Sequence, residues 1–477
     1  MTTIVLLRRD LRLYDNPALF YACKQGNILP VYIADTEAAT WETGQASQWW
    51  LHHSLSALNQ KLEKHKLRLC LKTGDTTTVL LQLCKELNSQ LVVWNRRYEP
   101  DSISADKHTK AQLSNAGITV KSFQANVLNE PWTVMNKQGT PFKVYTPYWK
   151  HCLAQSIIET PLPEPQEICG TRNDIDSCSL ESLQLLPHSP DWSSGIQASW
   201  QPGEQSAQQK WADFLHSGIN NYQQDRNIPS IQGTSGISPH LAFGEISPRQ
   251  IWHDLQVLIT TEQNPNYTCY LSEIGWREFS YYQLYHYPHI TERSFNPKFD
   301  HFRWEEKPDA LQQWQRGLTG YPIVDAGMRE LWHTGYMHNR VRMVVASFLC
   351  KDLLIHWHQG ARWFWDTLVD ADLASNTAGW QWTAGCGADA APFFRIFNPV
   401  IQGEKFDPQA YYVKRWVPEL KQLPNRFIHQ PWAAPADVLS AADVVLGQTY
   451  PAPMVDHKVA RLEALERLKD LKNQMQE

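Results

Sequence analysis

Strand-like and helix-like segments alternate over the first 125 residues, and this alternation restricts the fold more than any other feature. Apolar runs rich in β-branched residues occur at residues 3–9, 28–34, 67–72, 91–96 and 118–123, with helical patterns between them at 47–65 and 77–89. Strands separated by helices favour a doubly wound parallel sheet, because each crossover must pass over a face of the sheet. We therefore expect an α/β domain over residues 1–130.

The first expected strand is not followed by a glycine-rich loop. A dinucleotide-binding domain carries G-x-G-x-x-G at this point, whereas this chain has the charged, turn-like segment "RRDLRLYDN" at residues 8–16. An ordinary Rossmann-like oxidoreductase with a diffusible cofactor is therefore disfavoured.

The composition changes after the α/β pattern ends. Residues 160–205 are rich in proline, serine and acidic side chains, so we expect a linker over residues 131–205. From residue 206 onward helical patterns follow one another, for example at 310–320 and 361–374, and no clear strand pattern occurs. The sequence predicts a second, all-helical domain over residues 206–477.

Tryptophan is unusually frequent, with 21 residues against 16 Phe and 18 Tyr. A buried indole N–H requires a partner, so bulk packing rarely uses so many. Two interpretations stay open at this stage: a tryptophan-rich core, or indoles that stack on flat ligands or carry electrons. The net charge of −5 shows no basic excess, although a local basic groove for nucleic acid remains possible.

The nine cysteines are scattered and form no C-x-x-C pair, so zinc, iron–sulfur and thioredoxin-like sites have no support. The apolar run at the start of the chain is too short for the core of a signal peptide. No stretch reaches 18 uncharged apolar residues. We expect a monomeric, cytoplasmic protein without a metal centre or a membrane span.

Four polar or aromatic motifs stand out in the second half. They are "GTSGISPHLAFGEIS" (233–247), "IGWREFSYYQLYHYP" (274–288), "MHNRVRM" (337–343) and "DADLASNTAGWQW" (370–382). The first could offer backbone N–H groups and hydroxyls to a phosphate, but a capped loop explains it equally well. Each of the others, taken alone, also fits a core or amphipathic helix.

Together with "GYPIVDAGMREL" and "FFRIFNPVIQGEKFD", these motifs resemble the photolyase/cryptochrome family. The similarity runs from "LLRRDLRLYDNPAL" near the start to "YPAPMVDHKVAR" near the end. The resemblance implies an N-terminal α/β antenna domain, a linker, and a helical domain that holds FAD in a U shape.

The resemblance also implies which residues bind FAD. These are Tyr222, Thr234, Ser235, Gly236, Ile237, Ser238, Arg342, Asp370, Ala371, Asp372 and Asn376. Arg342 would pair with Asp370 beneath the isoalloxazine ring. Asn376 occupies the position beside flavin N5, where photolyases typically carry Asn and plant cryptochromes carry Asp; an amide favours the fully reduced, anionic flavin.

Three tryptophans match the family's electron relay: Trp380 at the inner end, then Trp357 and Trp304. The alternative is three ordinary core indoles. The implied reaction is light-driven electron transfer from reduced FAD to a pyrimidine dimer, which splits and returns the electron. The cofactor supplies this chemistry, so no nucleophile or metal is expected.

The implied substrate is damaged DNA with the dimer flipped out of the duplex. The residues expected to contact the lesion or DNA are Arg226, Glu273, Trp276, Arg277, Asn339, Arg340, Met343, Trp382 and Gln402. Trp276 and Trp382 would stack on the dimer, and Glu273 would hydrogen-bond it. Photolyases for the (6-4) lesion carry two histidines where this chain has Asn339 and Met343. The chain therefore resembles cyclobutane pyrimidine dimer (CPD) photolyases, with some likeness to class III.

Two expectations concern the antenna and the alternative function. Deazaflavin binders tend to carry Lys where this chain has Ala242, and the Asn–Glu pair of some folate binders is replaced by Asp101 and Ser102. We expect methenyltetrahydrofolate bound in the class III manner, with deazaflavin as the alternative. A blue-light-sensing cryptochrome is the alternative function; the short charged C-terminal end and Asn376 favour repair.

Overall fold

The computed structural model describes residues 2–35, 39–171, 175–389 and 394–473. The chain divides into two compact units. Unit 1 comprises Met1–Asn220 and Ser235–Pro288, and unit 2 comprises Asn221–Thr234 and His289–Glu477. Two segments that the sequence pattern grouped with the helical domain, 206–220 and 235–288, thus belong to the unit that contains the sheet.

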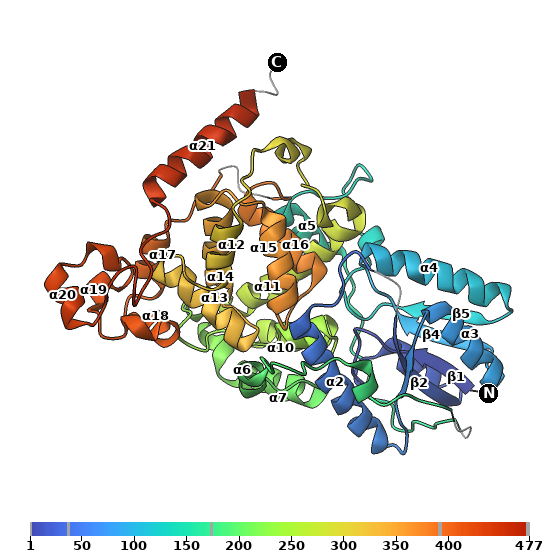
Figure 1. Ribbon diagram of the computed structural model, residues 1–477. Coiled ribbons are helices and arrows are strands. Elements are labelled where there is room, and N and C mark those ends of the chain that lie inside the picture. The colour runs from blue at the N-terminus through green and yellow to red at the C-terminus, as the bar shows by residue number, and fades with distance from the viewer. Residues whose placement is uncertain (1, 36–38, 172–174, 390–393, 474–477) are drawn as a thin grey trace. The chain divides into compact units, whose positions relative to one another are not determined.

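Unit 1 contains a five-stranded parallel sheet, as predicted (Figure 1). The strand order in this sheet is β3-β2-β1-β4-β5. The strands are β1 (Thr2–Leu6), β2 (Asn27–Ala34), β3 (Cys70–Thr73), β4 (Leu91–Asn95) and β5 (Thr119–Phe123). Each coincides with one of the apolar runs, because parallel strands covered on both faces are nearly continuous in apolar residues.

Both faces of the sheet are buried. Ile4 and Leu6 of β1 share a hydrophobic cluster with Leu80 and Leu83 of α3 (Thr76–Leu87) and Leu113 of α4 (Pro100–Asn115). The helices α3 and α4 lie side by side in Figure 1 and contact each other. Val5, which strand alternation directs to the opposite face, is also fully buried, and α1 (Pro17–Cys23) contacts β1, β2, β4 and β5.

The remainder of unit 1 is helical. Its helices are α2 (Gln45–Glu63), α5 (Tyr145–Gln155), α6 (Ser194–Ser199), α7 (Glu204–His216), α9 (Ser238–Ala242), α10 (Pro248–Glu262) and α11 (Pro265–His286). In the expected linker, residues 131–205, the described residues form η1 (Pro131–Thr133), the eleven-residue helix α5, and the short helices η2 (Glu181–Leu183) and α6 before α7 begins at Glu204. The aromatic motif 274–288 lies in α11, which contacts α5 and α10.

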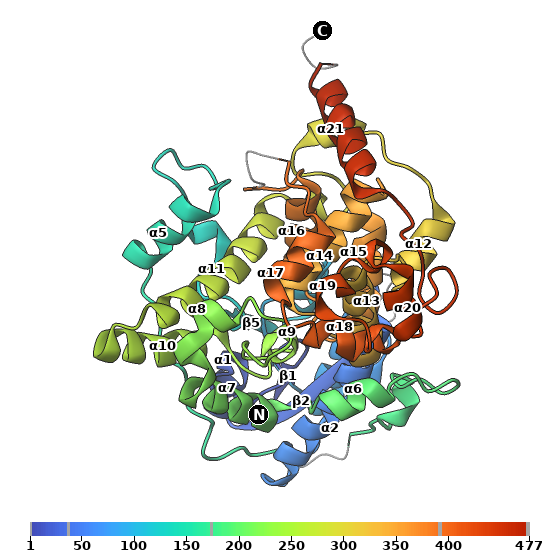
Figure 2. The same cartoon turned by 90° about the vertical axis from the view of Figure 1, so that its left-hand side faces the viewer.

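Unit 2 is helical, and the described residues contain no strand longer than an isolated bridge. Its helices are α8 (Tyr222–Asp225), α12 (Pro308–Gln315), α13 (Pro322–Thr334), α14 (Asn339–Ser347), α15 (Trp357–Thr367), α16 (Leu373–Ala384), α17 (Pro399–Phe406), α18 (Tyr411–Trp416), α19 (Asn425–Ile428), α20 (Ala436–Ala441) and α21 (His457–Asn473), with a π-helical turn η6 (Phe348–Asp352). Figure 2 shows α14 near α16, and the two helices are in contact.

The predicted helical pattern over 361–374 is interrupted. Helix α15 ends at Thr367 and α16 begins at Leu373. The side chain of Asp372 accepts a hydrogen bond from Ser375 N at 2.8 Å and so caps α16. An aspartate at this position satisfies an N–H group that has no partner inside the helix, and it therefore starts a new helix here.

Candidate functional site

A buried ion pair forms the centre of the candidate site in unit 2. Arg342 Nη2 on α14 donates to both carboxylate oxygens of Asp370, at 3.0 and 2.8 Å, and Arg342 Nε donates to Met337 O at 2.7 Å. The Asp370 side chain is 5% exposed and that of Arg342 is 24% exposed. Burial alone would lower the pKa of Arg342, but Asp370 reverses this and raises it. The predicted pair is therefore present, with the Arg342 guanidinium charged.

Tyr336 extends this pair toward Thr234. The Arg342 guanidinium lies 5.1 Å from the Tyr336 ring centre, and the Tyr336 hydroxyl hydrogen-bonds Thr234. Burial raises the pKa of Tyr336 and so keeps its hydroxyl protonated, while Arg342 and the Thr234 hydrogen bond reduce the shift. Thr234 was predicted as a cofactor residue and Tyr336 was not, although it stands in the quoted motif "GYMHNRVRM".

Glu330 of α13 is a further acid of this site and lies close to the start of α14. It accepts a hydrogen bond from Tyr412 OH at 2.6 Å and a long one from His338 N at 3.4 Å. Burial raises the pKa of Glu330 to about 7, and Tyr412 and Arg342 reduce the shift. The sequence gave no signal for this carboxyl, because a Glu inside an amphipathic helix is normally exposed.

His338 begins α14 instead of facing a ligand as an acid. Its Nδ1 accepts a hydrogen bond from Arg340 N at 3.2 Å and caps the helix. Burial, followed by the charges of Arg340, Arg342 and Arg226, lowers the pKa of His338 to about 4. Its Nε2 is buried and has no partner among the residues that the structure describes. The imidazole is therefore neutral near pH 7.

Helix α16 positions the predicted amide. Asn376 Nδ2 donates to Ala361 O of α15 at 2.9 Å. This bond uses one of the two amide hydrogens, so the amide oxygen and the other hydrogen can still bond to a ligand. Asp372, one turn earlier, uses its carboxylate in the helix cap, and Ala371 between the two acids is buried.

The three predicted relay tryptophans all lie in unit 2. Trp357 and Trp380 are buried and Trp304 is half-buried. The His356 ring lies 5.2 Å from Trp304 and 5.5 Å from Trp357, and so it touches both indoles. Burial lowers the pKa of His356 to about 4, assisted by the charge of His358. A neutral imidazole thus connects the two outer tryptophans.

The inner tryptophan is tightly enclosed. Trp380 contacts Phe364 at a ring distance of 5.0 Å and Trp314 at 6.2 Å. A Cβ atom at Gly360 would lie 2.0 Å from the Trp380 ring, so only glycine fits there. The buried Nε1 of Trp357 has no hydrogen-bond partner in the described part of the chain. A radical cation on Trp357 would find no acceptor for its proton among these residues.

Other predicted DNA contacts of unit 2 surround the start of α14. Arg340 donates to Asn227 Oδ1 at 2.5 Å and lies 4.5 Å from the Phe406 ring centre. Arg226 lies 5.2 Å from the ring of Tyr222. The remaining members differ in exposure: Asn339 is exposed, and Met343, Trp382 and Gln402 are half-buried.

In unit 1, three predicted lesion contacts lie on α11 and are half-buried: Glu273, Trp276 and Arg277. Trp276 stacks on Tyr145 with ring centres 3.7 Å apart, which leaves at most one face for a ligand. Arg277 donates to Asn126 O at 2.7 Å and lies 4.6 Å from the Tyr281 ring centre. Its guanidinium is therefore engaged inside unit 1.

The predicted phosphate segment 235–238 also lies in unit 1. Ser235 Oγ accepts from Tyr270 OH at 2.8 Å, and Gly236 has a φ of +63°. A Cβ atom at Gly236 would lie 3.6 Å from Lys210 Nζ. Burial lowers the pKa of Lys210, and its ammonium lies 5.1 Å from the Trp200 ring centre. Sequence reasoning missed this cation because Lys210 is 26 positions away from Gly236 in the chain.

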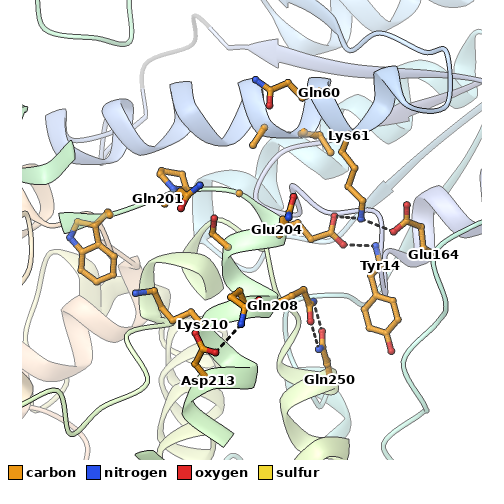
Figure 3. A pocket seen from close by; sticks show the side chains of 18 of the residues that line it. Tyr14, Gln60, Lys61, Glu164, Gln201, Glu204, Gln208, Lys210, Asp213 and Gln250 are labelled. Atoms are coloured by element: carbon orange, nitrogen blue, oxygen red, sulfur yellow. Dashed lines mark hydrogen bonds and ion pairs between the residues drawn. The ribbon is translucent and has the colours of Figure 1, made fainter. Parts of the chain in front are cut away.

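Lys210 and Trp200 line a cleft of about 1370 Å³ in unit 1 (Figure 3). On its far wall, Lys61 of α2 pairs with Glu164 at 2.6 Å and Glu204 at 2.9 Å. Lys61 is bound to these two carboxylates, whereas Lys210 lies near Gly236, where an anionic ligand could reach it.

The residues present fit a flavin dinucleotide. In unit 2, the Arg342–Asp370 pair and the free amide oxygen of Asn376 offer charge and hydrogen bonds to the polar edge of a flavin. In unit 1, the Gly236 turn with the Lys210 ammonium and the Ser235 hydroxyl offers a small, positively charged cradle suited to phosphate.

The described residues contain neither a helix suited to span a membrane nor a group of side chains suited to hold a metal ion. No helix there has the length and apolar character that crossing a bilayer requires. No group of three or more His, Cys, Asp or Glu side chains there is arranged to hold a metal ion.

Comparison with known proteins matches both parts of the chain to family models. Residues 3–166 match "DNA photolyase", and residues 270–470 match "FAD binding domain of DNA photolyase". The chain is 48% identical to a deoxyribodipyrimidine photo-lyase of Agrobacterium fabrum, over 97% of this chain and 96% of that protein. It is 39% identical to cryptochrome-2 of Arabidopsis thaliana, over 96% of this chain and 77% of that protein.

A solved structure agrees with these matches. The crystal structure of a bacterial class III photolyase from Agrobacterium tumefaciens superimposes with a TM-score of 0.96 at 47% identity, covering 99% of this chain and 98% of that one. Since relatives at this level of identity extend over nearly the whole length, the family suggested by the sequence motifs is confirmed: the chain belongs to the photolyase/cryptochrome family.

Proposed function

We propose that the protein repairs cyclobutane pyrimidine dimers in DNA under blue light. Reduced FAD would supply the electron that splits the dimer and takes it back. The relatives named photo-lyase support a repair enzyme, and the match to an FAD-binding family model supports the cofactor. The choice of lesion depends on the residues of this chain.

The observation that carries the lesion assignment is the state of His338. Repair of a (6-4) lesion calls for an imidazolium that can donate a proton to the adduct. His338 is the one histidine of the segment 337–343. Its Nδ1 caps α14, and burial with three neighbouring arginines lowers its pKa to about 4. A histidine held neutral in this way is a poor acid near pH 7.

The residues that we propose for cofactor binding lie in both units, and each set is considered by itself. In unit 2, Arg342, Asp370 and Asn376 would orient the flavin, with Ala371, Asp372, Tyr222 and Thr234 around it. In unit 1, residues 235–238 would hold the phosphates. One Asn376 N–H is bonded to Ala361 O, and the amide oxygen can accept a hydrogen bond at flavin N5 without supplying a proton.

Glu273, Trp276 and Trp382 would hold the flipped dimer, with Asn339, Arg340 and Met343 beside it. The free face of Trp276 would stack on a base, a contact worth about 1–3 kcal/mol. Arg226 and Gln402 would contact the DNA strand. We retain Arg277 in this set only as a support for α11, because its guanidinium binds Asn126 O and stacks on Tyr281.

The second chromophore would be methenyltetrahydrofolate, with a deazaflavin as the alternative. Ala242 lacks the ammonium that deazaflavin binders carry at the matching position. Absorption of the purified protein beyond that of the flavin identifies it, since a folate absorbs in the near ultraviolet and a deazaflavin in the blue. We also propose that the protein is a monomer acting in the cytoplasm, where its nine cysteines would stay reduced.

The test uses short DNA duplexes that carry either a CPD or a (6-4) lesion. The purified protein is reduced beforehand and illuminated with blue light, and a dark sample serves as control. We expect light-dependent loss of the CPD and an unchanged (6-4) lesion. Repair of the (6-4) lesion without the CPD would contradict the assignment.

The alternative function is that of a blue-light photoreceptor, favoured by the 39% identity to cryptochrome-2 over nearly the whole chain. The same assay separates the two functions. A protein that binds FAD and undergoes photoreduction but repairs neither lesion would act as a cryptochrome.

A further inference from the structure

The last helix of unit 2, α21, binds the segment that carries Trp304. Arg467 Nη1 donates to Arg303 O at 2.7 Å. The other terminal nitrogen of Arg467 pairs with Glu305 and, at 2.5 Å, with Glu463 of the same helix. Both chain neighbours of Trp304 are thus bound to one guanidinium.

A second ion pair joins the same two segments but contributes less. Arg303 Nη2 lies 2.8 Å from Asp470 Oδ2, and the Arg303 side chain is 66% exposed, so solvent screens this pair. Arg467 is only 14% exposed, and the same contact between a charged donor and a carboxylate is stronger there. Arg467 is therefore the main link between α21 and the Trp304 segment.

The first residue of α21, His457, is bound to the segment that precedes Trp357. His457 N donates to Tyr321 OH at 3.2 Å, and His457 Nδ1 lies 2.5 Å from Asp352 Oδ1 in η6. The chain runs from Asp352 through Leu354 to His356 and Trp357. Glu305 N donates to Leu354 O at 2.8 Å, which binds the two relay segments to each other as well.

We propose that α21 is a clamp that keeps Trp304 in contact with the relay, and that Arg467 is a positioning residue for photoreduction. This rests on the proposed function. Each electron that leaves Trp304 inward through Trp357 is replaced by one from an external thiol, and two such thiols together give one disulfide, two electrons and two protons. Electron transfer between rings weakens steeply as they separate. Holding Trp304 against His356, and His356 against Trp357, therefore sustains the flow.

The charges around the clamp make a test decisive. Three carboxylates, those of Glu305, Glu463 and Asp470, face two guanidiniums, those of Arg303 and Arg467. Removing the Arg467 charge leaves the region more negative, which by electrostatics alone favours an oxidised Trp304. Loss of positioning acts in the opposite direction. A slower photoreduction therefore reports the clamp and not the charge.

The experiment compares Arg467→Ala, Arg467→Lys and the control Arg461→Ala, an exposed arginine of the same helix. The first readout is hydrogen exchange of the Glu305 amide in the purified full-length protein. We expect its protection to fall roughly ten-fold in Arg467→Ala, in line with the loss of a hydrogen bond to a charged group. Arg467→Lys should recover part of it, and Arg461→Ala should match the wild type.

The second readout is the rate of FAD photoreduction with an external thiol, which should fall in the same order. Repair by protein reduced beforehand should be the same in all variants. Unchanged exchange, or faster exchange with unchanged photoreduction, overturns the clamp if Trp304→Phe lowers photoreduction. If Trp304→Phe also has no effect, the relay assignment fails instead. Should Arg467→Ala not fold, Asp470→Asn gives the same readouts with smaller changes.

Discussion

Two buried clusters, one in each unit, use the same kinds of residue in opposite ways. In unit 1, Glu245 is fully buried and accepts hydrogen bonds from Trp50 Nε1 at 3.1 Å and Gly203 N at 2.8 Å, and its other oxygen contacts His240 Nδ1. In unit 2, the Arg342–Asp370 pair is less enclosed, with 24% of the Arg342 side chain exposed. The unit 2 indole N–H of Trp357 is buried without a partner among the described residues.

The comparison shows that a buried charge is not by itself evidence of a functional site. The Glu245 carboxylate is satisfied by donors of its own unit, although Nε2 of its partner His240 is buried without a partner among the described residues. Leaving a buried donor unpaired costs about 1–3 kcal/mol, so the open groups of unit 2 call for a use other than stability. We propose a ligand for the ion pair and electron transfer for the indole as that use.

The largest effect should separate the two tryptophans. Trp357→Phe should reduce FAD photoreduction to the background rate, because phenylalanine is far harder to oxidise than tryptophan. Trp50→Phe should leave photoreduction intact but lower the free energy of unfolding by about 1–3 kcal/mol, since Glu245 loses a buried donor. Transient absorption of the tryptophan radical and thermal unfolding measure the two. Equal photoreduction in both variants would remove the distinction between the clusters.

The acids of the two clusters should differ in the same way. Asp370→Asn should weaken FAD retention by about 3–5 kcal/mol, because Arg342 is left without its counter-charge. Glu245→Gln should lower the melting temperature while the folded protein keeps its flavin. Flavin content per chain, measured below the melting temperature of each variant, distinguishes them. A full flavin complement in Asp370→Asn would exclude the assigned role.

Much of this contrast was accessible from the sequence, and some was not. The five strands follow from near-continuous apolar runs, and the Arg342–Asp370 pair follows from the family motifs. The helix break at Asp372 had a signal, an acid three residues before Ser375, but the apolar periodicity across it concealed the cap. The Trp50–Glu245 bond and the Arg467 clamp join residues 195 and 162 positions apart. Local patterns carry no information about such contacts.

A smaller effect concerns how the free energy of unfolding depends on pH through Glu330, which lies near the Arg342–Asp370 pair. Folding raises its pKa from 4.5 to about 7. Between these values the native state binds a proton that the unfolded state does not, so this group's contribution to stability falls as pH rises. Glu330→Gln cannot titrate. Its stability relative to the wild type should rise between pH 4.5 and 7, by at most about 3 kcal/mol.

Chemical unfolding at several pH values measures this difference. His338 titrates in the same range, but it does so in both proteins and cancels from the comparison. The control is Glu419→Gln, which removes the half-exposed partner of Arg329 at 2.7 Å. Its stability difference should not change over that pH range. A flat difference for Glu330→Gln would show that the carboxyl is already ionised in the native state.

The smallest effect concerns one cation in each unit. It tests whether DNA contacts unit 2 through Arg226. Arg226 is half-buried, stacks on Tyr222 and lowers the pKa of the neighbouring Arg340, although burial is the larger cause of that shift. Two guanidiniums held near each other are suited to a phosphate backbone. Arg226→Ala should flatten the log–log salt dependence of DNA affinity by about one unit if it contacts one phosphate.

The matched control is Lys64→Ala, an exposed cation beside the unit 1 cleft, which should leave the slope unchanged. Fluorescence anisotropy with a CPD-containing duplex over a series of salt concentrations measures both slopes. An equal decrease for both variants would mean that DNA responds to net charge rather than to a site in unit 2. A slope that stays constant only for Arg226→Ala would place the DNA contact on unit 1.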